Sequence, residues 1–310
     1  MALQIRNLSK TYANGVHALR DVTLTIPAGM YGLLGPNGAG KSTLMRILAT
    51  LQEADGGRAT LTDPDGTRLD VLRDQDAVRR TLGYLPQEFG VYPKVSAEAL
   101  LDHFALLKGV AERRARRAVV EALLRQTNLW EVRRQKLGGY SGGMRQRFGV
   151  AVALLGDPKL MIVDEPTAGL DPAERVRFLN LLSELGENSV VILSTHIVED
   201  VSELCTRMAI IDRGRILLES EPLRAIAALQ GQIWKRVVDR GEVAALERAH
   251  AVISTKLLAG RSVVRVYAPA TPAPGFEPAE ADLEDVYFCT LAGHIGRTDG
   301  ESRPALLAAG

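Results

Sequence analysis

Hydrophobic and polar positions alternate along residues 1–30, with turn signals at 13–15 and 27–29. This pattern predicts short antiparallel strands. A second small hairpin is expected in the polar, Asp- and Gly-rich stretch 53–76. From about 96 to 135 the apolar spacing is that of helices. Many arginines interleave with these apolar positions, which favours solvated helix faces over a nucleic-acid surface.

Apolar runs and amphipathic helices alternate in the next part of the chain. "KLMIVDEP" and "SVVILSTH" are typical of buried strands, "AERVRFLNLLSEL" predicts a helix between them, and "MAIIDRGRILLE" predicts a hairpin. The alternation predicts an α/β fold with a parallel sheet. After Pro222 a weaker α+β pattern leads to a last helix in "DLEDVYFCTLAG". We therefore expect an accessory domain over 223–292 and a disordered tail over 293–310.

The composition is that of an ordinary soluble globular chain, with 310 residues, 46% apolar and 24% charged. A net charge of +1 gives no overall field that would attract nucleic acid or an anionic membrane. Cys205 and Cys289 lack metal-ligand spacing, and we expect buried thiols in a reducing compartment. The start lacks the apolar core of a signal peptide, and no apolar run is long enough to span a membrane.

The stretch "GPNGAGKST" combines small residues, one cation and two hydroxyls directly after the apolar "MYGLL". It matches G-x-x-x-x-G-K-[ST], whose bare backbone N–H groups cradle phosphates at the start of a helix, here expected over Lys41–Leu51. The predicted nucleotide-binding residues are Gly35, Pro36, Asn37, Gly38, Ala39, Gly40, Lys41, Ser42 and Thr43. Lys41 would reach the β- and γ-phosphates, and the Ser42 hydroxyl would bind Mg²⁺. The alternative is a Gly-rich turn capped by Ser42. We favour the phosphate loop, because the stretch joins a predicted strand to a predicted helix, which is the context that the motif requires.

Asp164 and Glu165 follow the apolar run "LMIV". Since chemistry gathers at the carboxyl ends of parallel strands, we expect both acids at the same edge as the phosphate loop. Asp164 would hold Mg²⁺ directly or through water, and Glu165 would accept a proton from an attacking water. The alternative is an acidic pair that caps a helix starting near Pro166.

A second Gly-rich turn, "YSGGMRQR", opens another predicted helix. Ser141 is a good N-cap, and Gly142 and Gly143 leave their N–H groups accessible. Taken with the phosphate loop and the acidic pair, this turn resembles the signature of the nucleotide-binding subunit of an ATP-binding cassette (ABC) transporter. The resemblance runs from about Leu3 to Leu218.

The resemblance implies a role for further residues. Tyr12 matches the aromatic that stacks on adenine, and Gln87 matches the glutamine that joins the Mg²⁺ and water site to the membrane subunit. Asp171 matches the loop that contacts the partner's active site, and His196 matches the switch histidine at the γ-phosphate. Taken singly, these could be a strand aromatic, a polar loop residue, a helix N-cap and a strand-end histidine. The other histidines lie outside any motif.

The fold that the resemblance implies is a P-loop NTPase core, with a mixed sheet and an antiparallel β subdomain, over residues 1–222. A helical subdomain carrying the signature is expected at about 90–150. The signature has Tyr140 and Met144 where leucine and glutamine are commonest, which resembles the branch that energises ABC-2-type exporters. The C-terminal helix "ADLEDVYFCTLAG" resembles that branch too.

The implied function is ATP hydrolysis that drives export, with ATP and Mg²⁺ bound between two head-to-tail subunits. The partners would be a second copy or a homologous ATPase, and a separate transmembrane permease on whose cytoplasmic face the chain sits. Phe89, Val91 and Tyr92 would supply an apolar contact to that permease. The alternatives are a DNA-associated ATPase or a translation factor of the cassette class. The short separation of Lys41 from Ser141 leaves no room for the coiled coil of the former, and one cassette is too few for the latter.

Overall fold

The computed structural model describes residues 1–87, 90, 92–167, 170–183 and 189–296. The chain divides into two compact units, Met1–Pro222 and Leu223–Gly310. Each unit has its own β-structure and its own buried hydrophobic residues.

The first unit begins with a four-stranded antiparallel sheet in the order β2-β1-β4-β5. Its strands are β1 (Ala2–Thr11), β2 (His17–Pro27), β4 (Gly56–Thr62) and β5 (Arg68–Asp70). Alternate residues of β1 and β2 are buried, as the period of two in the sequence predicts. The antiparallel strands and the second hairpin predicted from the sequence are therefore confirmed.

A second, six-stranded sheet has the order β10-β9-β3-β8-β7-β6. Its strands are β3 (Gly29–Leu34), β6 (Leu82–Leu85), β7 (Leu160–Asp164), β8 (Val190–Thr195), β9 (Arg207–Asp212) and β10 (Arg215–Ser220). Every neighbouring pair is parallel except β9 and β10, which form a hairpin. The carboxyl ends of β3, β7 and β8 therefore lie at one edge, and the predicted α/β fold is confirmed.

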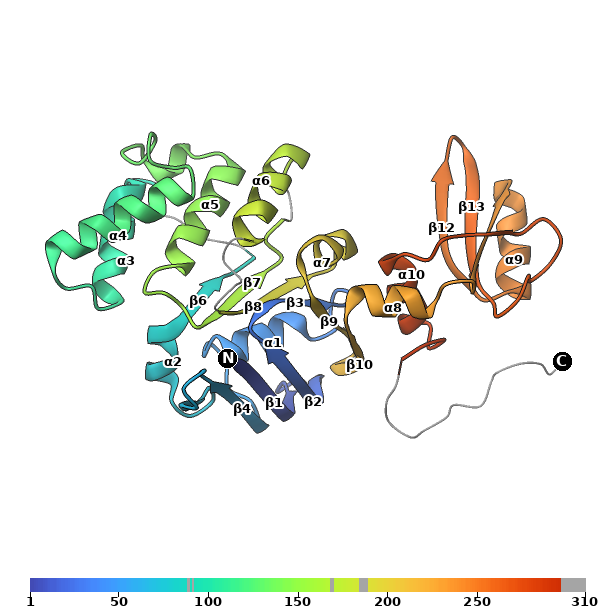
Figure 1. Ribbon diagram of the computed structural model, residues 1–310, viewed down its shortest axis with the longest axis horizontal. Helices are drawn as coiled ribbons and strands as arrows, with labels where there is room; N and C mark the ends of the chain where they lie inside the picture. Colours follow the sequence, from blue (N-terminus) through green and yellow to red (C-terminus); the bar gives the residue numbers. More distant parts are fainter. Residues whose placement is uncertain (88–89, 91, 168–169, 184–188, 297–310) are drawn as a thin grey trace. The chain divides into compact units, whose positions relative to one another are not determined.

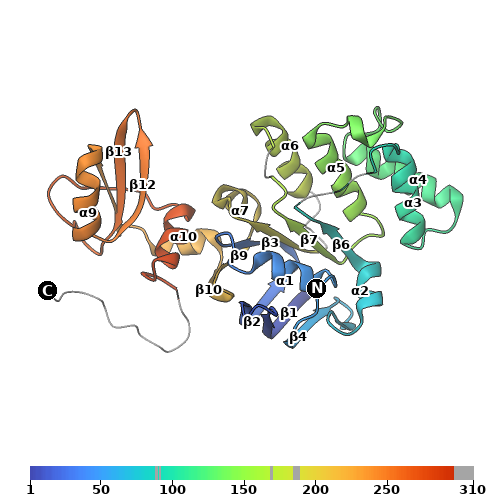
Figure 2. The same cartoon turned by 180° about the vertical axis from the view of Figure 1, so that it is seen from behind.

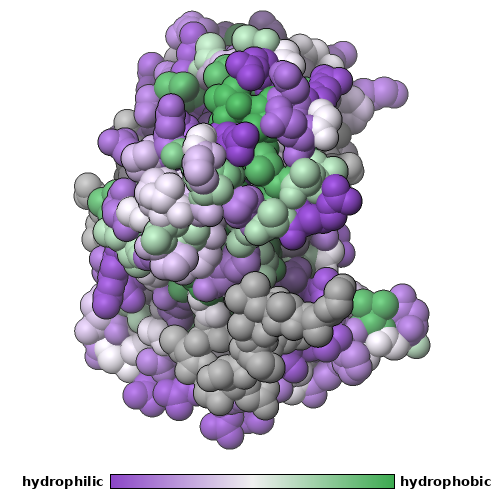
Figure 3. Space-filling view, turned by 90° about the vertical axis from the view of Figure 1, so that its right-hand side faces the viewer, coloured by the Kyte–Doolittle hydropathy of each residue, from purple (hydrophilic) through white to green (hydrophobic). Residues whose placement is uncertain are grey.

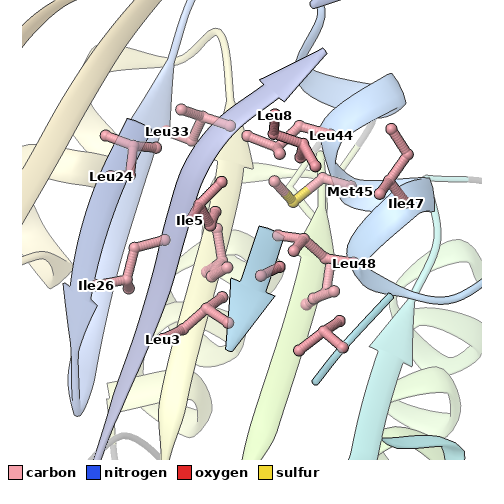
Figure 4. Packing of buried hydrophobic residues seen from close by; sticks show 14 of the residues in the cluster. Leu3, Ile5, Leu8, Leu24, Ile26, Leu33, Leu44, Met45, Ile47 and Leu48 are labelled. Atoms are coloured by element: carbon pink, nitrogen blue, oxygen red, sulfur yellow. The ribbon is translucent and has the colours of Figure 1, made fainter. Parts of the chain in front are cut away.

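Helix α1 (Lys41–Leu48) packs between the two sheets of this unit. Figure 4 shows Leu3, Ile5 and Leu8 of β1 in one packed layer with Leu44 and Leu48 of the helix. The helix begins at Lys41 as predicted, but it ends at Leu48 and not at Leu51. The backbone of Thr50 takes a left-handed conformation (φ 59°), which a helix cannot continue through. Helices α2 (Gln75–Thr81), α6 (Pro172–Ser183) and α7 (Val198–Leu204) complete the α/β part.

Three helices form a separate cluster, α3 (Ala97–Leu107), α4 (Arg113–Gln126) and α5 (Gly142–Ala153), with a short 3-10 turn η1 (Leu137–Gly139) before α5. Figures 1 and 2 show them grouped beyond β6, the edge strand of the sheet. They share their own apolar core, which contains Leu101, Leu124 and Phe148. Serine side chains cap α3 and α5, and Glu112 caps α4. The arginine-rich helical stretch is thus a packed subdomain.

The second unit is α+β, with a sheet in the order β12-β13-β11-β14. Its elements are α8 (Pro222–Ala228), β11 (Ile233–Val238), η2 (Arg240–Glu242), α9 (Val243–Ala249), β12 (Val252–Leu258), β13 (Arg261–Tyr267), β14 (Glu277–Pro278) and α10 (Leu283–Leu291). Leu257 and Leu258, at the end of β12, are exposed. On the face seen in Figure 3, hydrophobic side chains gather in a narrow band between hydrophilic ones.

The first residues of the expected tail are ordered against this unit. The ring of His294 stacks on Tyr267 with centroids 5.3 Å apart. Its backbone N–H donates to the Cys289 carbonyl at 2.9 Å. Residue 294 of the expected tail therefore contacts this unit, and residues 297–310 lie outside the described residues. None of the helices that the described residues form has the length and apolar character that a bilayer span needs.

Candidate active site

The phosphate loop joins the end of β3 to the start of α1 through conformations that only glycine adopts without strain. Gly38 and Gly40 have φ values of 81° and 109°. A Cβ on Gly35 would lie 2.3 Å from the carbonyl oxygen of Ile211, and one on Gly40 would lie 2.4 Å from that of Ala18. The loop is therefore packed against its neighbours, and its glycines are required by both backbone and space.

Lys41 is buried inside this loop, with 5% of its side chain exposed. Its Nζ donates to the carbonyl oxygens of Gly35 at 2.6 Å and Pro36 at 3.3 Å. It also lies 3.6 Å from Oε1 of Glu165. Burial lowers the pKa of Lys41, and the Glu165 carboxylate opposes this shift. The cation is thus directed into the loop, where the phosphates of a nucleotide would lie.

Glu165 leaves the end of β7 in a strained conformation, with φ of 49°. Its backbone N–H donates to the Ser194 carbonyl of β8 at 2.8 Å, which holds the turn in place. Its Oε2 lies 2.5 Å from Nδ1 of His196, at the end of β8. Glu165 is 8% exposed, so Lys41, Glu165 and the less buried His196 form a continuous chain of side-chain contacts. Three residues predicted from separate motifs are brought together here.

Asp164 lies beside this group and is 4% exposed. Burial is the main cause of its raised pKa, and the Glu165 carboxylate adds to it. The nearby Ser194 hydroxyl opposes this rise of the pKa, although within normal hydrogen-bond geometry neither that hydroxyl nor the Asp164 Oδ1 has a partner among the described residues. An orphaned carboxylate oxygen beside a phosphate loop fits a divalent cation, which Asp164 and Ser42 would hold. No cluster of three acidic, His or Cys side chains occurs in the described part of the chain, so phosphate and water oxygens would complete such a site.

The alternative interpretation of the acidic pair, as a cap of a helix near Pro166, is wrong. The next helix, α6, begins at Pro172. Its cap is Asp171, whose Oδ1 accepts from the backbone N–H of Glu174 at 2.9 Å. The capping role suggested for Asp171 is therefore observed.

The turn at Ser141 belongs to the helical cluster. Its hydroxyl accepts from the backbone N–H of Met144 at 3.2 Å, as expected of an N-cap. Ser141 and Gly142 are exposed, whereas Gly143 is covered by α6, and a Cβ there would lie 2.5 Å from Oε2 of Glu174. No hydrogen bond or ion pair found among the described residues joins this turn to the phosphate loop.

Two further predicted residues lie at the margins of the site. The Tyr12 hydroxyl is 3.0 Å from the Thr43 hydroxyl and donates to Gln52 at 3.3 Å. The bond to Thr43 lowers the pKa of Tyr12 and places its ring beside the first turn of α1. Gln87 is exposed. Of the predicted permease contact, Tyr92 is 63% exposed, and Phe89 and Val91 lie outside the described residues.

One buried charge near the site was not predicted. Asp200 on α7 is fully buried and hydrogen bonded to Thr167, which follows the acidic pair. Only its position four residues after His196 could have drawn attention to it, since nothing else in the sequence distinguishes it from its exposed neighbour Glu199.

Comparison with known proteins agrees with this geometry. The family model described as "ABC transporter" matches residues 19–168. An uncharacterized ABC transporter ATP-binding protein of Bacillus subtilis is 36% identical over 220 residues, which are 71% of this chain and 70% of the relative. The daunorubicin/doxorubicin resistance ATP-binding protein of Streptomyces peucetius is 37% identical over 220 residues, which are 70% of this chain and 64% of the relative.

Solved structures are similar over the same part. A dimeric ATP-binding cassette in a post-hydrolysis state, bound to ADP and Pi, is 27% identical, with a TM-score of 0.63, and the match covers 71% of this chain and 98% of that one. The ATP-binding subunit of an ABC transporter is 28% identical, with a TM-score of 0.64, and the match covers 74% and 93%. The resemblance seen in the sequence is confirmed, and the chain belongs to the ABC transporter family as one of its ATP-binding cassettes, with the ATPase activity of that family.

Proposed function

We propose that the chain is the ATPase subunit of an exporter. It dimerises head to tail on ATP and drives a separate transmembrane permease from the cytoplasmic face of the membrane. Export is supported by the relatives, which include the resistance protein of Streptomyces peucetius and a probable multidrug ABC transporter ATP-binding protein of Escherichia coli. The dimer is supported by the dimeric cassettes among the similar structures.

The observation that carries the proposal is the group of Lys41, Glu165 and His196, with Glu165 lying 3.6 Å from the Lys41 Nζ and 2.5 Å from the His196 Nδ1. Phosphoryl transfer requires positioning and electrostatics more than covalent chemistry. Lys41 and the loop N–H groups would bind the phosphates, and Glu165 would accept the proton of the attacking water. His196 would hydrogen bond the γ-phosphate.

The remaining site residues would bind the metal ion, the adenine of ATP and the partner subunit. Ser42, Asp164 and Gln87 would hold Mg²⁺, which neutralises charge on the phosphates when it is bound. Tyr12 would stack on adenine, and Asp171 would contact the partner's site.

The signature turn, residues 141–143, is the reason to propose a dimer. Its capped helix start is exposed at Ser141 and Gly142 and can offer N–H groups to an anion, whereas Gly143 packs against Glu174 of α6. A second copy would supply the γ-phosphate that it binds. Driving closure from 1:99 to 99:1 requires about 5.5 kcal/mol of differential affinity. Several charge-assisted hydrogen bonds of roughly 1.5–3 kcal/mol each supply that.

Ser141→Arg tests the arrangement. We expect ATP affinity like that of the wild type, because the chain's own phosphate loop is unchanged, and no ATP-driven dimer in sedimentation. Ser96→Arg is the matched control, since Ser96 caps α3 of the same cluster by accepting from Ala99 at 3.3 Å. It should dimerise. If Ser141→Arg dimerises normally, or loses ATP affinity while dimers persist, the head-to-tail arrangement is wrong.

A further inference from the structure

Asp200 is a fully buried carboxylate whose two oxygens have different partners. Oδ1 accepts from Nε of Arg175 at 2.9 Å and lies 2.7 Å from its Nη2. Oδ2 accepts from the hydroxyl of Thr167 at 2.6 Å. Arg175 belongs to α6 and compensates the charge of the buried acid.

Oδ2 also reaches the strand that precedes His196. The hydroxyl of Thr195 lies 3.4 Å from it and accepts from the backbone N–H of Ile197 at 3.0 Å. Thr167 is two residues beyond Glu165, and Thr195 is directly before His196. One carboxylate therefore contacts both chain segments that carry the pair of Glu165 and His196, and it also holds the helix that follows Asp171.

We propose that Asp200 is a positioning residue for ATP hydrolysis, which keeps Glu165 and His196 in register through Thr167, Thr195 and Arg175. The inference rests on the proposed role of Glu165. A non-glycine residue with φ of 49° keeps that conformation only where its surroundings determine it. The hydrogen bonds of Thr167 provide such a constraint on the segment after Glu165. Misplacing a reacting group by about 1 Å can cost about 100-fold in rate.

If the buried pair of Asp200 and Arg175 had a purely structural role, its loss would affect stability and not the rate of hydrolysis. A similar buried pair in the second unit provides a control. In the second unit, Asp285 is 2% exposed, and its Oδ1 accepts from Nε of Arg265 at 2.7 Å. It is the same kind of buried acid–guanidinium pair, in a unit without the phosphate loop. Both pairs should contribute to stability, but only Asp200 should affect the rate of hydrolysis.

The experiment compares Asp200→Asn with Asp285→Asn in the full-length chain, measuring kcat and KM for ATP, ATP affinity and melting temperature. Asn keeps the shape and one acceptor oxygen but not the charge. We expect Asp200→Asn to lower kcat by about 10- to 100-fold with ATP affinity unchanged, because no contact of the phosphate loop is altered. Asp285→Asn should keep the wild-type kcat, even if its melting temperature falls as much as that of Asp200→Asn.

Thr167→Val and Thr167→Ser extend the test should Asp200→Asn not fold. Valine removes only the hydroxyl, so kcat should fall, and serine restores the hydroxyl and should recover it. The inference is overturned if these variants keep kcat within about twofold of the wild type. It is also overturned if both asparagine variants lose kcat equally. A Glu165→Gln variant separates failure of the proposed function from failure of this inference. If it hydrolyses ATP normally, the role proposed for Glu165 fails. If it is inactive and the Asp200 and Thr167 variants hydrolyse ATP normally, only the present inference fails.

Discussion

Replacing Glu165 with glutamine removes a proton acceptor and a negative charge while nearly preserving the shape of the side chain. Glutamine nearly preserves the volume and keeps an oxygen that can accept from His196, whose Nδ1 lies 2.5 Å from the carboxylate. It cannot take a proton from water. The negative charge 3.6 Å from the Lys41 Nζ also disappears, which leaves that cation freer to bind phosphate.

The expected loss is that of general-base catalysis, about 10²–10⁴-fold in kcat. This corresponds to roughly 3–5 kcal/mol of barrier. Binding should not fall, because the loop and Asp164 are unchanged. The variant should therefore bind ATP, dimerise and remain dimeric for want of hydrolysis.

Phosphate release measured beside size-exclusion chromatography with ATP checks both parts. Asp164→Asn is the contrast, because it weakens the proposed metal site and should impair the bound nucleotide as well as the rate. If Glu165→Gln releases phosphate at near the wild-type rate, another group is the base. His196, whose side chain is 47% exposed, then becomes the first candidate.

Three further predictions concern binding, packing and the thiols. Lys41→Ala should abolish ATP binding in a fluorescent-nucleotide titration, since it removes the cation at the phosphates; wild-type affinity would contradict the site. Gly83→Ala should lower stability by about 1–3 kcal/mol in thermal denaturation, because its Cβ would lie 2.3 Å from a backbone carbonyl oxygen of α5. Gly56→Ala should not lower stability, because no atom of a non-adjacent residue lies within 4 Å of the position of its Cβ. Burial raises the pKa of both Cys205 and Cys289 to about 12, so both thiols stay protonated at pH 8 and should react with iodoacetamide only on unfolding; fast labelling of the native chain would refute this.

The sequence predicts the phosphate loop and the acidic pair well because each is contiguous. The function proposed for the loop depends on backbone N–H groups within nine residues, and spacing alone identifies them. Asp164 and Glu165 end an apolar run, and parallel strands end at one edge of a sheet, so their place beside the loop also follows. His196 was expected only from the family resemblance, and the structure places it at the end of the adjacent strand.

Asp200 escapes such reasoning because its partners are distant in sequence and its helix is short. α7 has seven residues, too few for a periodic pattern to separate its buried and exposed faces. Glu199 is exposed and Asp200 buried, although the two carry the same chemistry. The end of α1 at Leu48 and the packing of His294 were missed for a similar reason, since each depends on local backbone or tertiary contact.

The buried charges of the first unit position the groups of the candidate site more than they stabilise the fold. A buried ion pair contributes little net stability, because desolvation offsets the attraction between the charges. A chain selected only to fold would gain more from apolar side chains at these positions. Instead, Lys41 lies against carbonyl oxygens, Asp164 is a carboxylate held in a buried position and Glu165 keeps a strained backbone. Departures from the rules of folding concentrate where a protein does chemistry, and here all three lie at the carboxyl edge of one sheet.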